Sequence, residues 1–521
     1  MTLTVPRAPR RVAATALAGL ALLPLAACGG DDAAGPASPD GLARLAPASA
    51  PFYIEAAVRP EGELKADLDA LIGKFAPGES LDKLSTKAVK DDDPDGLNFE
   101  RDIKPWLGER AGLVITGLKA GGDDVEAAGI IETTDPDKAI ATLRDKSENK
   151  LEDAEYNGVK YVRDTSDMTV GAIVDEALVI GTEPAFKAVV DTSKGKGLDT
   201  NAEFKKVVDA VDENALAFIY GDVTRGLELA KSSGQANAQQ LESVRELLTR
   251  QGLKTVAAGF AVTDTAVKIR FASGMKDNGQ GEAAAATLAA LPAGSWAAFG
   301  LGDLGKSLTD ALDGLKGAGG PGSDVQSGLD LLEQQAGIDV QKDLISWMGQ
   351  TGIFVRGASL NDIGGALVIQ SKDPAATKAA MAKARTLVAG GGLPAEDLKG
   401  SGIDDGFSIK PGNAPVEIFV ALAGERFVLA ANRAAFDEAI NPAKKLEDDE
   451  AFKAAGEQLG DGLKPTFYLD FPKVTGLIGL AAGDQPGYAQ VKTYLDKIGT
   501  IVAGSKREGD LQLQTVAVGV K

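Results

Sequence analysis

Apolar residues along this chain follow two spacings, one typical of strands and one typical of helices. Phe52, Ile54 and Ala56 alternate with other residues, as in a half-buried strand. The next apolar residues repeat at intervals of three and four, which predicts one apolar face of a helix: Leu64, Leu68, Leu71, Ile72 and Phe75. The pattern therefore predicts a strand followed directly by a helix.

Turn and capping residues extend this prediction along the chain. Asp135-Pro136 and Asp373-Pro374 each place an N-cap residue before a proline, which favours the start of a helix. Asn157-Gly158 lies between short apolar alternations and predicts a tight hairpin turn. Residues 169–180 and 256–271 are predicted to form two more hairpins. Strands joined by both hairpins and helices indicate an α+β fold with largely antiparallel sheets packed by helices, rather than a parallel doubly wound sheet.

The first 27 residues are predicted to be a signal peptide. Basic residues precede an apolar run over 12–25, which is too short for a stable membrane span. The run ends in Leu25-Ala26-Ala27-Cys28, which resembles the lipobox of bacterial lipoproteins. The resemblance implies cleavage before Cys28 and a lipid on its sulfur, with an ordinary signal peptide as the alternative. The Arg10-Arg11 pair leaves the export route open.

A flexible tether is predicted at residues 28–45. Positions 29–40 are Gly, Ala, Pro, Ser and Asp, a composition that cannot form a core. A lipid would supply the membrane affinity that an acidic body does not have. We therefore expect a lipid-anchored protein on the extracytoplasmic face of the cell membrane.

The body of the chain repeats one order of motifs. Residues 102–108 match residues 343–349, at an offset of 241 (343 − 102). The segment 130–136 likewise matches 368–374, and the later matches keep the same order. The repeat predicts two tandem copies of one α+β unit, at residues 46–276 and 290–521, with a hinge at 277–289. Trp106 and Trp347 fall at equivalent positions and are predicted to be core anchors.

Several of these motifs resemble a duplicated bacterial envelope lipoprotein family that is catalogued only as a domain of unknown function. The matching segments are residues 102–108, 156–159, 178–181 and 198–204. The second copy departs from the pattern, with Ser346 in place of proline and Ala430 in place of glycine. The resemblance brings no established activity and implies no catalytic residues.

Composition excludes several kinds of site. The 521 residues contain no His and one Cys, which rules out His-based triads, His metal sites and an intrachain disulfide. Asp and Glu number 75 against 55 Lys and Arg, a net charge of −20. This balance argues against a nucleic-acid partner, because a polyanion requires a basic surface.

Residues 300–307 match the phosphate-binding pattern GxxxxGKS, with Lys306 as the phosphate partner. The corresponding part of the first copy, at residues 58–63, carries proline and acid and lacks the pattern. Glycine is also frequent in this chain. We therefore predict that this segment is a flexible connection that binds no nucleotide.

The spacing of Asp91, Asp93 and Asp95 before Gly96 matches a calcium loop, with Asp102 in the closing position. Pro94 inside the loop and Asn98 after it depart from that pattern. The favoured interpretation is a solvated acidic loop before a helix. Calcium bound to Asp91, Asp93 and Asp95 is kept as the alternative.

Two classes of function remain open. The first is a non-enzymatic, lipid-anchored envelope protein with a binding or scaffolding role and no required cofactor, whose partner is an envelope protein or a small ligand. The second is an extracellular hydrolase that uses carboxylates or a metal. Acids converging in one concave pocket would favour the hydrolase, and a large apolar groove without them would favour binding.

Overall fold

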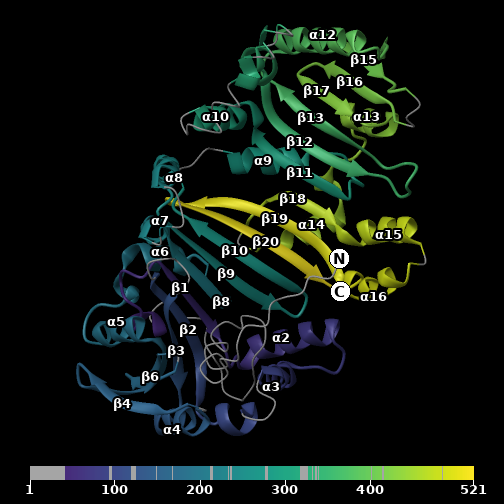
Figure 1. Cartoon of the computed structure of the whole chain (residues 1–521). Coiled ribbons are helices and arrows are strands. Elements are labelled where there is room, and N and C mark those ends of the chain that lie inside the picture. Colours follow the sequence, from purple (N-terminus) through teal and green to yellow (C-terminus); the bar gives the residue numbers. More distant parts are fainter. Residues whose placement is uncertain are drawn as a thin grey trace. The chain divides into compact units, whose positions relative to one another are not determined.

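The computed structural model describes residues 41–521 except for 93–96, 119–124, 148, 167, 212–214, 233, 235–237, 276–279, 317–326, 331–332, 335–336, 338, 401, 413–415, 461 and 484. The chain divides between Met275 and Lys276 into two units, called unit 1 and unit 2 below. Figure 1 shows the elements of both. Each unit is described by itself.

Unit 1 is built on an antiparallel sheet. Its strands are β1 (Phe52–Ala57), β2 (Leu107–Leu118), β3 (Val125–Thr133), β4 (Leu151–Tyr156), β5 (Val159–Asp164), β6 (Thr169–Val174), β7 (Ala177–Thr182), β8 (Ala215–Asp222), β9 (Thr255–Thr263) and β10 (Ala266–Ser273). Their order across the sheet is β10-β9-β8-β1-β2-β3-β7-β6-β5-β4, and every neighbouring pair is antiparallel. The first strand of the unit therefore lies in the middle of the sheet.

Helices pack on both faces of this sheet. They are η1 (Leu42–Arg44), α2 (Gly62–Phe75), α3 (Leu81–Asp92), the π-helix η2 (Phe99–Ile103), α4 (Pro136–Lys146), α5 (Glu183–Ser193), η3 (Leu198–Thr200), α6 (Ala202–Asp209), α7 (Val223–Ser232) and α8 (Ala238–Arg250). Tyr53 packs edge-on against Phe204 of α6, with 6.1 Å between ring centroids. Ala111 pairs with Ala56 and joins Trp106 in a second core. Because side chains alternate along a strand, Tyr53 and Ala56 face opposite sides of the sheet.

Unit 2 is also built on an antiparallel sheet. Its strands are β11 (Ala297–Asp303), β12 (Met348–Arg356), β13 (Gly364–Ser371), β14 (Ala395–Asp397), β15 (Asp405–Ile409), β16 (Ile418–Ala423), β17 (Arg426–Ala430), β18 (Pro465–Asp470), β19 (Ile498–Glu508) and β20 (Leu511–Val520). They follow the order β20-β19-β18-β11-β12-β13-β17-β16-β15-β14. The main core lies on one face and contains Phe354, Phe436 and Phe452.

The helices of unit 2 follow its strands in a similar pattern. They are α9 (Gln280–Ala289), α10 (Leu304–Lys316), the π-helix η4 (Val340–Ile345), α12 (Pro374–Gly390), α13 (Arg433–Ile440), η5 (Leu446–Asp448), α14 (Glu450–Glu457), α15 (Phe471–Ala482) and α16 (Pro486–Leu495). Helix α9 contributes Ala284, Ala285 and Leu288 as buried side chains.

The α+β class and the antiparallel sheets that the sequence predicted are confirmed, and so are the local signals. Asp135 Oδ1 accepts the Lys138 N–H at 3.0 Å and caps α4, whose first residue is Pro136. Asn157 and Gly158 have positive φ angles of 48° and 81°, which fits the two-residue turn between β4 and β5.

The two units share one strand order, because replacing each strand by the one ten places later converts the first order into the second. Trp106 and Trp347 also match: each is buried and donates its indole N–H to the carbonyl oxygen four residues earlier, at 2.6 and 3.2 Å. Phe204 packs on Tyr220 as Phe452 packs on Tyr468. These observations support the duplication, which stays a prediction.

Two boundaries differ from the prediction. The tether was expected to extend to residue 45, but Leu42, Ala43 and Leu45 are buried in unit 1. The hinge was expected at 277–289, but residues 280–289 form α9, which packs on β11 and β12. The physical reason is the same in both cases, because short Ala- and Leu-containing segments have enough apolar surface to join a core. Residues 28–40 and 277–279 lie outside the described residues.

Candidate functional site

The structure describes only part of the site residues predicted from the sequence. Cys28 lies outside the described residues. Asp91 is in the last turn of α3, whereas Asp93 and Asp95 are outside the described part of the chain. Among the residues that are described, no group of three His, Cys, Asp or Glu side chains is placed to hold a metal ion.

Asp102, the proposed closing residue of the calcium loop, has a structural role. Its carboxylate accepts the Asn98 N–H at 2.9 Å, while Asn98 Oδ1 accepts the Arg101 N–H at 2.9 Å. Such reciprocal bonds resemble a capping box at the start of η2, with the acid one residue later than usual. Bonding to the Arg101 guanidinium, with help from Asn98 and Lys146, holds the pKa of Asp102 well below its usual range. The carboxylate is therefore already engaged by protein groups.

Unit 2 repeats this arrangement at Asp343. Its carboxylate accepts the Asp339 N–H at 2.9 Å, and Asp339 Oδ1 accepts the Lys342 N–H at 2.9 Å. The Lys383 ammonium also bonds to Asp343 and lowers its pKa. An acid that closes the same turn in both units, only one of which has the acidic run, indicates a structural residue.

The segment 300–307 is part of a strand and a helix rather than a loop. Gly300 and Gly302 lie within β11, and α10 begins at Leu304. A Cβ atom on Gly300 would lie 2.0 Å from the carbonyl oxygen of Ala284 in α9, so this glycine permits close helix packing. Lys306 Nζ pairs with Asp310 at 2.6 Å. The flexible connection expected here is therefore wrong, and the absence of nucleotide binding stays a prediction.

A buried polar network lies in the middle of the sheet of unit 1. Glu55 has no exposed surface, and its two oxygens accept bonds from Tyr53 Oη (2.6 Å) and Arg110 Nη1 (3.0 Å). Burial raises the pKa of Glu55, although Tyr53 and Arg110 oppose that change. Arg110 and Glu132 also line a pocket of about 220 Å³. Because Glu55 is enclosed and both its oxygens are engaged, it is placed to stabilise the fold rather than to reach a substrate.

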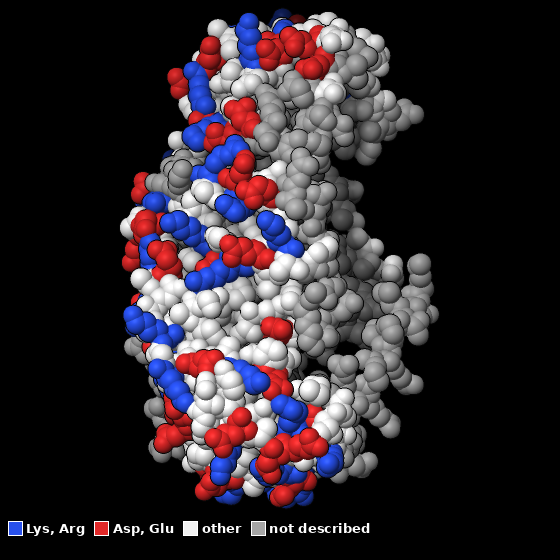
Figure 2. Space-filling model, turned by 60° about the vertical axis from the view of Figure 1, so that its left-hand side comes forward, with Lys and Arg blue, Asp and Glu red and all other residues white. Residues whose placement is uncertain are grey.

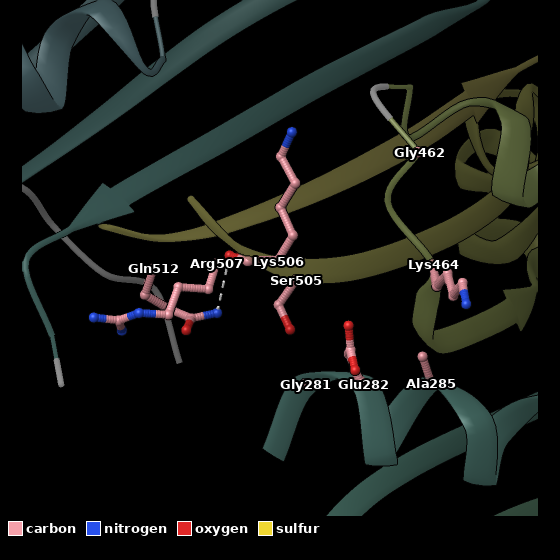
Figure 3. Close-up of a pocket in the computed structure, with 9 residues that line it drawn as sticks. All are labelled: Gly281, Glu282, Ala285, Gly462, Lys464, Ser505, Lys506, Arg507 and Gln512. Carbon is pink, nitrogen blue, oxygen red and sulfur yellow. Dashed lines mark hydrogen bonds between the residues drawn. The ribbon is translucent and has the colours of Figure 1, made fainter. Parts of the chain in front are cut away.

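A second pocket, of about 390 Å³, lies within unit 2 between α9, β19 and the residues before β18. Lys464, Lys506 and Arg507 line it together with Glu282 and Ser505. Figure 3 shows that the side chains of Lys506 and Arg507 extend away from Glu282. The charged groups therefore do not converge on one point, as a catalytic or anion-binding site requires.

One face of the unit 1 sheet carries a continuous apolar row. The strand registers place seven residues side by side across seven strands: Phe271, Ala258, Ile219, Ile54, Leu113, Gly129 and Ile180. Phe271 and Ile219 are 43% and 38% exposed, whereas Ile180 is buried at the other end. We call these seven residues row 1.

Unit 2 has the corresponding row on the corresponding strands. It consists of Val516, Ala503, Phe467, Phe299, Ile353, Leu367 and Leu429, called row 2. Phe299 and Ile353 are 39% and 40% exposed, and Phe299 packs edge-on against Phe467 at 6.3 Å. Adjacent strands lie about 4.8 Å apart, so a row of seven strands is about 29 Å long. Both rows consist only of apolar residues and expose large side chains.

Sequence reasoning did not find these rows. The alternation at Phe52, Ile54 and Ala56 showed one apolar face, but a row becomes visible only when the register of seven strands is known. The available signal was the presence of apolar residues on both faces of one strand, as at Phe218 and Ile219 of β8.

The charged side chains, unlike the apolar rows, do not gather into one continuous group on the face that Figure 2 shows. On the face that Figure 2 shows, Lys and Arg are interspersed with Asp and Glu, and neither sign forms an extended area of its own. Among the described residues, charged side chains form local pairs, such as Arg433 with Asp437 and Arg144 with Asp153. The net charge of −20 therefore does not create a single acidic binding face in this view.

Comparison with protein families identifies the chain's relatives. The model of the family described as "Protein of unknown function (DUF3352)" matches residues 12–473. The chain belongs to this family. The resemblance drawn from the sequence to a family of unknown function is thereby confirmed. DUF3352 membership brings no reaction or ligand with it, so function has to be argued from the structure.

Other comparisons add little. No curated protein matches the sequence. Two solved structures of TP0453, in crystal forms IV and I, are 11% and 10% identical to the chain, with TM-scores of 0.26 and 0.24. They cover 45% and 46% of this chain and 81% of that protein. Within the described part of the chain, no helix is both long and apolar enough to cross a bilayer.

Proposed function

We propose that this protein is a lipid-anchored, extracytoplasmic envelope protein that binds the apolar part of an amphipathic ligand, without catalysis. The observation that carries the proposal is the pair of matched apolar rows. Row 2 exposes Phe299, Ile353 and Leu429, each by 37% to 40%, on one sheet face. Exposed apolar surface of this extent is unfavourable in water, and a ligand that covers it would be stabilised by the hydrophobic effect.

The polar groups at the centre of the unit 1 sheet favour binding over hydrolysis. Glu55, on the central strand of unit 1, is fully buried. Both oxygens of its carboxylate accept hydrogen bonds, from Tyr53 and from Arg110. It also points to the face opposite to row 1, since Ile54 and Glu55 are neighbours on one strand. The seven residues of row 1 and the seven of row 2 include none that could act as acid, base or nucleophile.

Fatty acid provides a simple probe of this proposal. The chain from residue 28 onward, with Cys28→Ser so that it carries no lipid, is titrated with cis-parinaric acid, whose fluorescence rises in an apolar environment. We expect saturable binding. In unit 2, Ile353→Asn should weaken it about tenfold or more, since burial of one such side chain contributes about 1.5–3 kcal/mol.

A matched control separates the row from exposed apolar residues in general. Leu360 is 52% exposed in unit 2 but lies outside row 2, so Leu360→Asn should leave the affinity unchanged. Ile219→Asn and Val125→Asn form the corresponding test and control pair in unit 1. Equal effects of the test and control variants, or absence of saturable binding, would contradict the proposal.

A further inference from the structure

We propose that the helix pair α15–α16 inserts into the surface of a lipid bilayer. This inference rests on the proposed envelope location but uses a different surface from the apolar rows. Four large apolar side chains on the pair are exposed: Ile478 (39%), Leu480 (62%), Val491 (51%) and Tyr494 (57%). Leu480 and Tyr494 have the highest exposed fractions among the large apolar side chains that the structure describes.

Helix α15 is apolar on all sides. Thr475 and Leu477 are buried and attach it to unit 2, whereas Ile478 and Leu480 point outward. Its one charged residue is Lys473, in the first turn. A helix that is apolar all around is normally covered on every side, either by protein or by lipid. The outer side of α15 is uncovered in the described structure, so it has the composition of a buried helix in an exposed position.

The pair is held as one element. Tyr488 Oη of α16 donates a hydrogen bond to the carbonyl oxygen of Thr475 in α15, at 3.0 Å. Figure 1 shows α15 and α16 next to each other. The exposed side chains of both helices therefore belong to one packed helix pair.

The corresponding helices of unit 1 show that the fold does not require this composition. Helices α7 and α8 follow β8 as α15 and α16 follow β18. The unit 1 pair contains seven charged residues: Arg225, Glu228, Lys231, Glu242, Arg245, Glu246 and Arg250. The unit 2 pair contains two, Lys473 and Lys492. The low charge of the pair is thus specific to unit 2, although α8 of unit 1 also exposes Val244 and Leu247.

Charge favours a bilayer as the occupant. Residues 470–497 contain three Asp and three Lys, a net charge of zero (3 − 3) in a chain of −20. Lys473 pairs with Asp470, and Lys492 pairs with Asp496. A hairpin of zero net charge, with Leu, Ile, Val and Tyr outward and with Lys473 in its first turn, suits a position at a membrane surface. Acidic lipids would not repel it.

The predicted anchor also favours a bilayer over a soluble partner. Cys28 precedes the first described residue, Gly41, by 13 positions (41 − 28), so the extended tether spans at most about 45 Å. A lipid on Cys28 would hold the body close to a bilayer at all times. A hairpin that inserts there would add a second attachment to the same bilayer.

Vesicle flotation tests the inference without the anchor. The chain from residue 28 onward, with Cys28→Ser, is mixed with phosphatidylcholine vesicles, with and without phosphatidylglycerol. We expect the chain to float with both, with little dependence on salt. Leu480→Ser and Tyr494→Ser should each lower the vesicle-binding constant about tenfold, as the loss of one inserted side chain predicts. The control Val244→Ser/Leu247→Ser on α8, where the residues are 43% and 44% exposed, should float as before.

A fluorescent variant gives an independent readout. Leu480→Trp should show a shift of emission to shorter wavelength when vesicles are added, and Val244→Trp should not. Both positions are exposed, so neither change should disturb folding. Absence of flotation, or flotation that Leu480→Ser leaves intact, would overturn the inference. The inference would also be overturned if the wild-type chain self-associates and Leu480→Ser does not, because a second copy would then cover the hairpin. Fatty-acid binding would be unaffected, so failure here leaves the apolar rows to be judged separately.

Discussion

Glu55 and Gly300 occupy equivalent positions in the two units. Each lies on the central strand directly opposite a glycine of the next strand, Gly112 for Glu55 and Gly352 for Gly300. In unit 2 the carbonyl oxygen of Ala284 approaches Gly300, so that α9 covers this point of the sheet. In unit 1 the Tyr53–Glu55–Arg110 network fills it. The same position in the two sheets is therefore covered by a helix in unit 2 and by a polar network in unit 1.

The Glu55 network predicts a pH dependence of stability. Burial raises the pKa of Glu55, so the folded state holds its proton to higher pH than the unfolded state does. The stabilising contribution is complete below the unfolded pKa and is lost as pH rises through the folded pKa. We expect the difference in unfolding free energy between wild type and Glu55→Gln to fall with rising pH. Urea unfolding from about pH 4 to about pH 8 measures it. A constant difference would contradict the assignment.

Asp102 should show the opposite pH dependence. Its pKa is lowered, mainly by Arg101, so its contribution is present above the unfolded pKa and is lost as pH falls through the folded pKa. Asp102→Asn should therefore destabilise unit 1 at neutral pH and less so in acid. The loss of unfolding free energy in Asp102→Asn should be the same with calcium and with chelator, because protein groups hold the carboxylate. A loss seen only when calcium is present would instead support the calcium loop at Asp91, Asp93 and Asp95.

The stability of unit 2 should depend on the small size of Gly300 in β11 but little on the charge of Lys306 in α10. Gly300→Ala should destabilise unit 2 by about 2 kcal/mol or more, because its Cβ would collide with the backbone of α9. Lys306→Ala should cost less than about 1 kcal/mol, since it removes an exposed ion pair. Gly476→Ala is the matched control, with open space around its Cβ position. Titration with magnesium-ATP should show no saturable binding, and binding that Lys306→Ala abolishes would refute this account.

The predicted anchor has a direct test by mass. Protein extracted from membranes with detergent should begin at Cys28 and carry acyl chains, because the residues before it match a lipobox. Cys28→Ser should lack the acyl mass, because serine has no sulfur to carry the lipid. Intact-mass spectrometry of both forms decides the point. A wild-type chain that still begins at Met1, or that lacks acyl mass, would refute the anchor.

Local chemistry determined how much could be predicted from the sequence. The Asp135-Pro136 cap and the Asn157-Gly158 turn depend on adjacent residues, and both were predicted correctly. The ends of the units were placed less well, because burial of Leu42 and Leu288 depends on distant partners. The apolar rows require the register of seven strands, which no local pattern contains. Glu55 looked like any other acid until its neighbours were known.

The central position of the first strand has a consequence for how each unit folds. Tyr53 pairs with Tyr220, 167 residues later (220 − 53), and Ala298 pairs with Tyr468, 170 residues later (468 − 298). Contacts so distant in sequence make folding slow, because a long loop must close before they form. Neither sheet can be completed while its last third is still missing. A chain of this topology therefore stays incompletely folded for longer during synthesis than one whose neighbouring strands are close in sequence.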